Sequence, residues 1–262
     1  MLFRSGTGAL GREVVTQLRE SGHSPRILSR KPAGTHVSLL DAEWVQGDLA
    51  TGAGLEKAVR GMDAIVHAGS AAVDLRKTHA TDVVGTRRLL AMAREAGVQH
   101  VVYISIVGME GIAYPYYKHK LAAEAVVREN IVPWSILRAT QFHTLMEIFL
   151  KPLSGLPRLA MIPFKWQFQP VDTRDVAKRL VEVVTGQPSG MLPDFGGPEA
   201  RDFKSIAESW LAARNERKRL VNLWLPMKFS RQFAEGKLLC PDHKDGTITF
   251  EKYLANKYPR PT

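Results

Sequence analysis

The glycine pattern near the start of the chain restricts its fold more than any other feature. Gly6, Gly8 and Gly11 follow the spacing G-x-G-x-x-G, and residues 10–20 then carry apolar side chains at helical intervals. Glycine adopts positive φ and lets a phosphate approach the backbone closely, while the first N–H groups of a helix attract anions. After a strand, this pattern is typical of the first turn of a dinucleotide-binding βαβ unit. The same spacing also occurs in ordinary tight turns, so the surrounding elements decide its meaning.

Short β-rich runs alternate with helical patterns along much of the chain. Strands are expected at residues 1–4, 26–29, 43–46, 64–67, 101–106 and 134–137, and helices at 10–20, 55–59, 78–96, 116–129 and 172–184. Strands that alternate with helices form right-handed βαβ units. We therefore predict an α/β fold with a Rossmann-type, doubly wound parallel sheet and the glycine loop at the carboxyl end of its first strand.

The residues after the second predicted strand bear on the choice of dinucleotide. Sites that prefer NAD place an acid there, whereas an Arg accommodates the 2′-phosphate of NADP. This chain has Ser29-Arg30-Lys31 followed by Pro32, without a carboxylate. We predict that Arg30 and Lys31 clamp the phosphate, so NADP(H) is preferred and NAD(H) is the second choice; the other interpretation is a basic surface turn. Asp48, with Leu49, meets the adenine or caps the segment that follows.

The composition is that of a soluble globular protein, 45% hydrophobic and 24% charged. No apolar run is long enough to span a bilayer, and residues 1–11 lack the apolar h-region that is typical of a signal peptide. Cys240 is the single cysteine and no metal-ligand spacing occurs, so we predict a cytoplasmic protein without a metal. Residues 201–262 hold 13 Lys/Arg against 7 Asp/Glu. We interpret this charge as a solvated face or a general anion attraction, because no nucleic-acid-binding motif accompanies it.

The chain is long enough for one domain and a smaller lobe. After Thr140 the alternation loosens into a stretch rich in Pro, Phe, Met, Leu and Trp. We predict an NAD(P)-binding Rossmann domain at 1–140 and a substrate-side lobe at 141–262, with about residues 171–185 packing back on the sheet. Five apolar side chains would form the core of this lobe or line an apolar pocket: Met146, Phe149, Met161, Phe164 and Trp166.

Several short runs together resemble an atypical short-chain dehydrogenase/reductase, in its NmrA-like NAD(P)H-binding branch. They are SGTGALG (5–11), LSRKP (28–32), GDL (47–49), DVVGT (82–86), VVYISIVG (101–108), LRATQFH (137–143), VDTRDVA (171–177) and GGPE (196–199). The resemblance implies that Arg30 faces the adenosine phosphate and that Ser105 lies beside the nicotinamide. It implies two further cofactor-binding segments: the pyrophosphate loop Gly6, Thr7, Gly8, Ala9, Leu10 and Gly11, and the segment Ala68, Gly69 and Ser70 beneath the ribose and pyrophosphate.

The first predicted strand departs from that family, which usually has a longer apolar strand leading into T-G-x-x-G-x-x-G. Here only Met1–Arg4 precede the loop, and Arg4 and Ser5 stand where the Thr and the first Gly are expected. Gly8 and Gly11 are retained. A short central strand loses ladder bonds and buried apolar area, about 25 cal/mol per Å². We expect the nucleotide site to form, but to be weaker and less rigid than in its relatives.

Short-chain reductases use a Ser, a Tyr and a Lys, and here Tyr116 and Lys120 follow the Y-x-x-x-K spacing. One turn of helix puts the two side chains on one face, where the ammonium would lower the pKa of the phenol. We predict Tyr116 as general acid, Lys120 as ribose ligand and Ser105 as the group that binds the substrate carbonyl. The interval from Ser105 to Tyr116 is shorter than usual in the family. The other interpretation is an aromatic cluster at a helix start, with Pro115 as its first residue.

Three residues after the sixth predicted strand, Gln141, Phe142 and His143, are candidates for the substrate side. His143 would polarise a carbonyl or be a structural histidine. The main hypothesis is an NADP(H)-preferring oxidoreductase that reduces a small carbonyl or quinone by hydride transfer. The rival is a non-catalytic NADP(H)-binding redox sensor, whose basic C-terminal quarter docks on a protein partner. A third hypothesis is a degenerate paralogue that binds no nucleotide.

Overall fold

The computed structural model describes residues 1–4, 8–32, 42–70 and 74–259, which form two compact units. Unit 1 comprises Met1–Ser105, Tyr114–Arg138 and Val176–Pro193, and unit 2 comprises Ile106–Ala113, Ala139–Asp175 and Asp194–Thr262. Each unit therefore draws residues from both sides of position 140. The functional division into 1–140 and 141–262 stays a prediction. None of the helices in the described ranges combines the length and hydropathy needed to cross a membrane.

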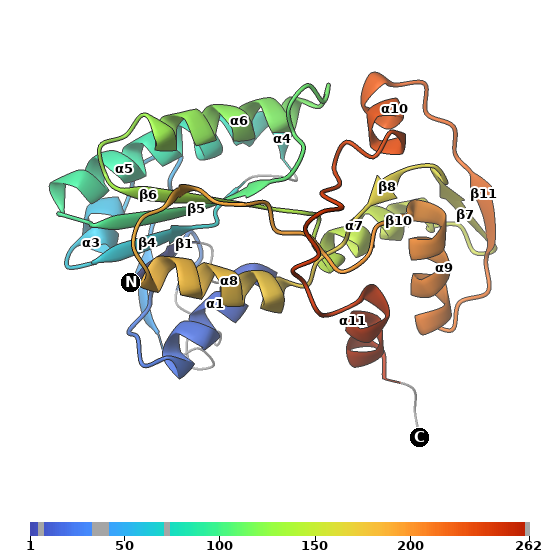
Figure 1. Cartoon of the computed structure of the whole chain (residues 1–262), viewed down its shortest axis with the longest axis horizontal. Helices are drawn as coiled ribbons and strands as arrows, with labels where there is room; N and C mark the ends of the chain where they lie inside the picture. The colour runs from blue at the N-terminus through green and yellow to red at the C-terminus, as the bar shows by residue number, and fades with distance from the viewer. Residues whose placement is uncertain (5–7, 33–41, 71–73, 260–262) are drawn as a thin grey trace. The chain divides into compact units, whose positions relative to one another are not determined.

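Unit 1 is built on a seven-stranded sheet in the order β3-β2-β1-β4-β5-β6-β9 (Figure 1). Its strands are β1 (Leu2–Arg4), β2 (Arg26–Ser29), β3 (Glu43–Gln46), β4 (Ala64–His67), β5 (His100–Ile106), β6 (Trp134–Ala139) and β9 (Gly190–Met191). The first six follow the Rossmann order 3-2-1-4-5-6. The predicted Rossmann-type α/β fold is therefore confirmed.

The short first strand is held on both sides. β1 pairs in parallel with β2 through Leu2, Phe3 and Arg4, and the same three residues pair with β4. Its neighbours β2 and β4 have four residues each, so β1 is one residue shorter than the strands it joins. The main chain extends this ladder by one bond, since the Arg26 N–H donates to the Met1 carbonyl over 2.8 Å. A strand of three residues is therefore enough to pair with both of its neighbours in the sheet.

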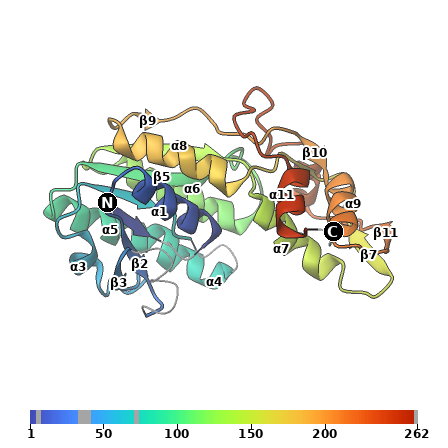
Figure 2. The same ribbon diagram turned by 90° about the horizontal axis from the view of Figure 1, so that it is seen from below.

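Helices cover both faces of this sheet, with α1 and α8 on one face and α4, α5 and α6 on the other (Figures 1 and 2). The bounds are α1 (Ala9–Glu20), α3 (Leu55–Val59), α4 (Leu75–Thr78), the π-helical turn η1 (His79–Val84), α5 (Gly85–Glu95), α6 (Pro115–Arg128) and α8 (Thr173–Thr185). A core of aliphatic side chains fills the α5/α6 face, among them Ile65, Leu89, Val101 and Ile136. Burying each of these side chains stabilises the fold by about 2 kcal/mol.

The GDL and DVVGT runs are brought together by close packing. At Gly85, the first residue of α5, an added Cβ would lie 2.7 Å from the Cβ of Leu49. Only glycine therefore lets α5 start against the segment that follows β3. This contact gives both runs a structural role.

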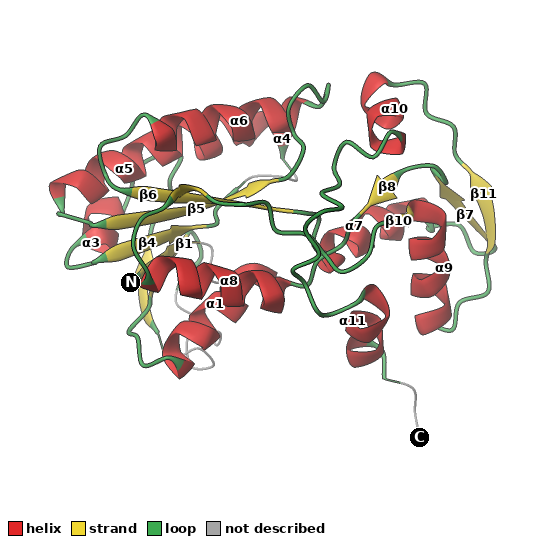
Figure 3. Ribbon diagram, viewed as in Figure 1, coloured by secondary structure: helices red, strands yellow, loops and turns green. Residues whose placement is uncertain are grey.

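Unit 2 combines two small sheets with four helices (Figure 3). β7 (Leu159–Ile162) and β11 (Arg219–Asn222) pair in parallel, and β8 (Gln167–Phe168) and β10 (Arg201–Asp202) pair antiparallel. The helices are α7 (His143–Leu153), α9 (Phe203–Ala213), α10 (Lys228–Ala234) and α11 (Phe250–Lys257). An aromatic cluster of Trp166, Phe168, Phe203 and Phe233 packs between these elements, with ring centroids 5.1–6.2 Å apart.

Candidate functional site

The carboxyl ends of the central strands of unit 1 lie along one edge of the sheet. The pairing registers place Arg4 beside both Leu28 and His67, and His67 beside Tyr103. Segments after β1, β2, β3 and β4, together with Ser105 in β5, hold the residues predicted to bind a cofactor. The topology of the sheet therefore gathers these segments at a single edge, where ligands bind in doubly wound folds.

The helix after the glycine loop begins at this edge. Gly6 and Thr7 lie outside the described residues, whereas Gly8 is the exposed N-cap of α1 with φ −76° and ψ 169°. Within the described residues no side chain caps the N-terminus of α1, and the first turn of α1 contains no acid. Ala9 is exposed, while Leu10 and Gly11 are buried in unit 1. The first N–H groups of α1 are thus not neutralised by a carboxylate, which suits an anion.

The basic pair after β2 is accessible. The side chains of Arg30 and Lys31 are exposed, and no ion pair holds either of them within the described residues. Their backbone is fixed, because Gln46 donates to the Arg30 carbonyl over 3.2 Å and the Trp44 indole donates to the Lys31 carbonyl over 3.0 Å. The structure presents two cations on an anchored turn.

Asp48 and Leu49 have local structural contacts. The Asp48 carboxylate accepts from the Ala50 N–H over 2.9 Å, and Leu49 is fully buried in the core. The capping interpretation of Asp48 is therefore met in this structure. A contact of this pair with an adenine stays a prediction.

Ser70, after β4, is joined to the catalytic candidate Tyr116. The Ser70 hydroxyl shares a 2.9 Å hydrogen bond with the Tyr116 phenol, while Gly69 donates its N–H to His67 over 3.4 Å. Ala68, between His67 and Gly69 in the chain, is half-buried. Two segments predicted independently, 68–70 and the start of α6, are therefore in direct contact.

Burial sets the pKa of Tyr116. Its side chain is largely buried and packs on the Tyr117 ring, which in turn packs on Tyr114; these three rings form the aromatic cluster of the other interpretation. Desolvation raises the pKa of the phenol far above its usual value, and the bond from Ser70 offsets only part of that rise. The sequence predicted that Lys120 lowers the pKa of this phenol. The structure does not show that effect, because the Lys120 ammonium bonds Tyr103 and the Ile104 carbonyl instead.

Lys120 is buried within unit 1. Its ammonium donates to the Tyr103 hydroxyl over 2.6 Å and to the Ile104 carbonyl over 2.9 Å. Desolvation lowers the pKa of Lys120 to about 8, and the negative charges of Asp82 and Glu124 oppose that shift. An ammonium has three donors, so these two bonds leave one for another partner.

Ser105 follows the Lys120 acceptor directly in β5. Its hydroxyl is buried and has no hydrogen-bond partner within the described part of the chain. Buried polar atoms are seldom left unpaired, and those that are call for a ligand or another physical reason. The catalytic candidate Ser105 therefore carries an unused donor at the sheet edge.

Sequence reasoning missed Tyr103 and Asp82 as parts of this arrangement. Tyr103 stands two residues before Ser105, and alternate residues of a strand share a face. That spacing placed Tyr103 on the same face as Ser105 and could have identified it as a partner for Lys120. Asp82 lies in η1, whose π-helical turn breaks the regular period expected over 78–96.

The substrate-side candidates belong to unit 2 and are held there by internal contacts. The Gln141 amide donates to the Leu238 carbonyl over 3.2 Å, and Phe142 is the N-cap of α7. His143 bonds the Ile248 carbonyl over 2.9 Å and packs on Phe250, and burial lowers its pKa. These contacts match the structural interpretation of His143. A contact of these residues with substrate stays a prediction.

The described residues fit a dinucleotide. Among these residues, α1 starts without a side-chain cap or an acid in its first turn, Arg30 and Lys31 after β2 have no ion pair, and the buried Ser105 hydroxyl has no partner. The described residues contain no group of three or more His, Cys, Asp or Glu side chains that could hold a metal ion.

Comparison with known proteins identifies the family. A family model described as NAD(P)H-binding matches residues 6–153. The chain belongs to this NAD(P)H-binding family. The NAD(P)H-binding family that the resemblance implied is therefore confirmed.

Two curated relatives illustrate the range of the family. The chain is 32% identical over 206 residues to (4-alkanoyl-5-oxo-2,5-dihydrofuran-3-yl)methyl phosphate reductase of Streptomyces griseus, an alignment that covers 76% of this chain and 68% of that protein. It is 28% identical over 183 residues to the photosystem II assembly factor Ycf39 of Trieres chinensis, covering 68% of this chain and 57% of the relative.

Solved structures share the fold at low identity. The NADPH-dependent quinone oxidoreductase of Escherichia coli, in complex with NADPH, matches with a TM-score of 0.77 and 16% identity over 98% of this chain and 99% of the other. UDP-glucose 4-epimerase of Thermotoga maritima, with UDP-glucose, matches with a TM-score of 0.76 and 16% identity over 97% and 95%. At such identities the likeness concerns the fold alone.

Proposed function

We propose that the protein is an NADPH-preferring oxidoreductase that reduces a small carbonyl or quinone-like acceptor. One observation carries this proposal: the Ser105 hydroxyl is buried and has no hydrogen-bond partner in the described part of the chain, and Ser105 directly follows Ile104, whose carbonyl anchors Lys120. In the unfolded chain the Ser105 hydroxyl would donate to water. Burying it without an acceptor costs about 1–3 kcal/mol. A substrate oxygen would satisfy it.

The nicotinamide, when bound, supplies the hydride. Ser105 donates a hydrogen bond to the substrate oxygen and fixes the carbonyl at the edge of the sheet. Tyr116, whose raised pKa keeps the phenol protonated, would be the proton donor to the same oxygen. Lys120 would offer its remaining N–H to a ribose hydroxyl of the cofactor.

The names of related proteins support this reaction class. The Streptomyces griseus relative is a reductase, and the Escherichia coli structure is an NADPH-dependent quinone oxidoreductase. Reduction of a carbonyl or of a quinone requires the same hydride donor and the same proton delivery. The cytoplasmic location and the absence of a nucleic-acid partner stay predictions.

Arg30 carries the proposed preference for NADPH. Replacing Arg30 by Ala is expected to weaken NADPH binding about 10- to 100-fold and to leave NADH binding within twofold, since a charge-assisted phosphate contact contributes about 1.5–3 kcal/mol. Calorimetric titration of each cofactor against both proteins measures the ratio. Arg94→Ala, which removes another exposed charge from unit 1 in the last turn of α5, serves as the matched control. An unchanged ratio of the two affinities in Arg30→Ala contradicts the assignment.

Tyr116 separates an enzyme from a binding protein. In the Tyr116→Phe variant we expect turnover with a carbonyl and quinone panel to fall about 100-fold or more, because the proton donor is lost. NADPH affinity should stay within twofold. Tyr117→Phe is the matched control, since this neighbouring phenol has no assigned role and should keep its activity. Equal turnover in all three proteins would remove Tyr116 from the mechanism.

One observation favours a second candidate function, the NADP(H)-binding redox sensor. The Tyr116 phenol is buried and hydrogen-bonded to Ser70, and its pKa is raised rather than lowered. The sensor hypothesis predicts saturable NADPH binding with no turnover on the same panel. It also predicts that Tyr116→Phe behaves like the wild type in every assay.

A further inference from the structure

Unit 2 exposes an apolar sheet face. β7 and β11 pair with Leu159 opposite Arg219 and Met161 opposite Val221. All four residues are exposed, whereas the alternate residues of β7 are buried. Because alternate side chains of a strand lie on opposite faces, these four share the solvent face of the small sheet. Three apolar side chains with a cation among them therefore project into solvent.

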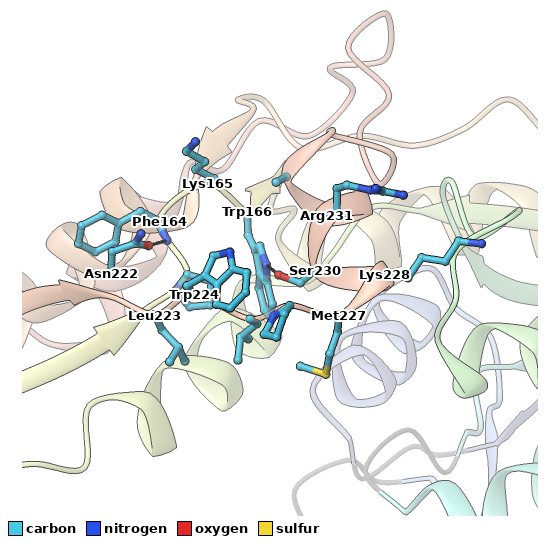
Figure 4. Close-up of a pocket in the computed structure, with 14 residues that line it drawn as sticks. Phe164, Lys165, Trp166, Asn222, Leu223, Trp224, Met227, Lys228, Ser230 and Arg231 are labelled. Atoms are coloured by element: carbon cyan, nitrogen blue, oxygen red, sulfur yellow. Dashed lines mark hydrogen bonds between the residues drawn. The ribbon is translucent and has the colours of Figure 1, made fainter.

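The chain that leaves β11 continues this surface. Trp224 is 77% exposed and Met227 is also exposed. They line the rim of a groove of about 640 Å³, whose other walls include Phe164, Trp166 and Pro226 (Figure 4). Of the five apolar residues weighed as core or pocket, Phe164 and Trp166 line this groove and Met161 lies on the exposed sheet face. A tryptophan left this far in water is seldom required by folding.

The same surface is strongly basic. Residues 148–171 and 217–234, which include β7, β11 and the groove walls, contain eight Lys/Arg and no Asp or Glu. Six of these cations are exposed and have no ion pair within the described residues: Lys151, Arg158, Lys165, Arg217, Arg219 and Lys228. Arg231 pairs with Glu235 over 3.5 Å and Lys218 with Glu216 over 3.1 Å, just outside the acid-free segments. The charge is therefore largely uncompensated.

We propose that this surface docks unit 2 on an anionic phospholipid bilayer. The docking face consists of Leu159, Met161, Val221, Trp224 and Met227 with the cations Arg158, Lys165, Arg219 and Lys228. Tryptophan and aliphatic side chains insert at the level of the headgroups. Lysine and arginine beside them attract anionic lipid, and each contributes to the affinity. The groove beside Trp224 provides an apolar lining for part of an acyl chain.

Two other occupants fit the docking face less well. A second copy of the chain would bring unpaired cations against one another, which self-repulsion opposes. The buried centre of a protein interface is depleted of charged residues, whereas here Arg219 stands directly beside Leu159 in the register. Alternation of cations with protruding apolar groups matches a surface that meets both headgroups and acyl chains.

Vesicle sedimentation tests the proposal with the full chain. We expect binding to vesicles of phosphatidylcholine and phosphatidylglycerol about tenfold or more stronger than binding to phosphatidylcholine alone, and a large loss of binding in high salt. Trp224→Ser should lose about tenfold, and the double charge reversal Arg158→Glu/Arg219→Glu should lose more. Both variants lie in exposed positions, and thermal unfolding checks that they fold.

Matched controls come from unit 1. Ile131→Ser removes an exposed apolar side chain and Lys57→Glu reverses an exposed charge, and both should bind vesicles as the wild type does. Equal binding to neutral and anionic vesicles, or equal losses in docking-face and control variants, overturns the proposal. A concentration-dependent dimer that Trp224→Ser abolishes, without vesicle binding, assigns the face to a second copy and also overturns it. NADPH affinity is expected to be the same in all these variants.

Discussion

Replacing Gly8 by Asp is expected to abolish dinucleotide binding while leaving the fold at least as stable as before. Gly8 is an N-cap in extended geometry, a position that Asp occupies favourably in helices. The new carboxylate would accept hydrogen bonds from the first N–H groups of α1. Its negative charge would repel a pyrophosphate at the N-terminus of this helix. We expect affinity for NADPH to fall about 100-fold or more, while the free energy of unfolding rises by about 0.5 kcal/mol.

The matched variant Gly8→Asn separates charge from size. Asn caps a helix as well as Asp and has nearly the same shape, but it carries no charge. NADPH affinity should fall less in Gly8→Asn than in Gly8→Asp, so that Gly8→Asn binds NADPH about tenfold more tightly than Gly8→Asp does. Titration calorimetry and urea unfolding supply both quantities. Retention of wild-type affinity by Gly8→Asp would place the phosphates away from α1.

A second large effect is expected at Glu147 in unit 2. Its buried carboxylate accepts hydrogen bonds from the Lys257 ammonium over 2.6 Å and the Trp210 indole over 3.3 Å, and from two tyrosines, Tyr253 and Tyr258, in the C-terminal segment. These donors lower the pKa of Glu147 to about 2 although burial opposes the shift. Glu147→Gln is expected to cost about 3 kcal/mol of unfolding free energy, because it leaves the Lys257 ammonium without its counter-charge.

The sign of the pH dependence follows from the lowered pKa. The stability due to this carboxylate is fully present above its ordinary pKa, about 4.5, and is lost as the pH falls toward 2. The difference between wild type and Glu147→Gln in urea unfolding should therefore narrow as the pH drops from 7 to about 3.5. Glu56→Gln, at an exposed pair with Arg60, is the control and should change stability by less than about 0.5 kcal/mol. A difference that stays constant with pH would contradict this account.

Much of unit 1 could be predicted because its signals are local. The strands at 26–29, 43–46 and 64–67 have the predicted bounds, and α6 and α8 differ from prediction by one residue at each end. The helix expected over 78–96 begins earlier, at Leu75, and passes through the π-helical turn η1. No local propensity predicts that turn, because packing in the folded unit decides it.

The candidate site residues could be selected from the sequence, but their contacts with one another could not. The sequence places Tyr116 and Lys120 on one helix, and from that spacing we expected the ammonium to act on the phenol. In the folded unit Lys120 instead reaches Tyr103 and the Ile104 carbonyl in β5, while Tyr116 pairs with Ser70. Which partner a buried lysine takes depends on the strand that packs against its helix. The partner of this lysine therefore depends on tertiary packing, which the residue spacing along one helix cannot predict.

The most direct test of the account is a paired calorimetric titration of the wild-type protein with NADPH and NADH. The proposed site at the carboxyl edge of the unit 1 sheet predicts saturable binding of both, with NADPH about tenfold or more tighter because Arg30 and Lys31 meet the 2′-phosphate. The absence of saturable binding by either dinucleotide would contradict it. The short strand β1 would then fail to support the glycine loop, and the roles given to Ser105, Tyr116 and Lys120 would fall with it.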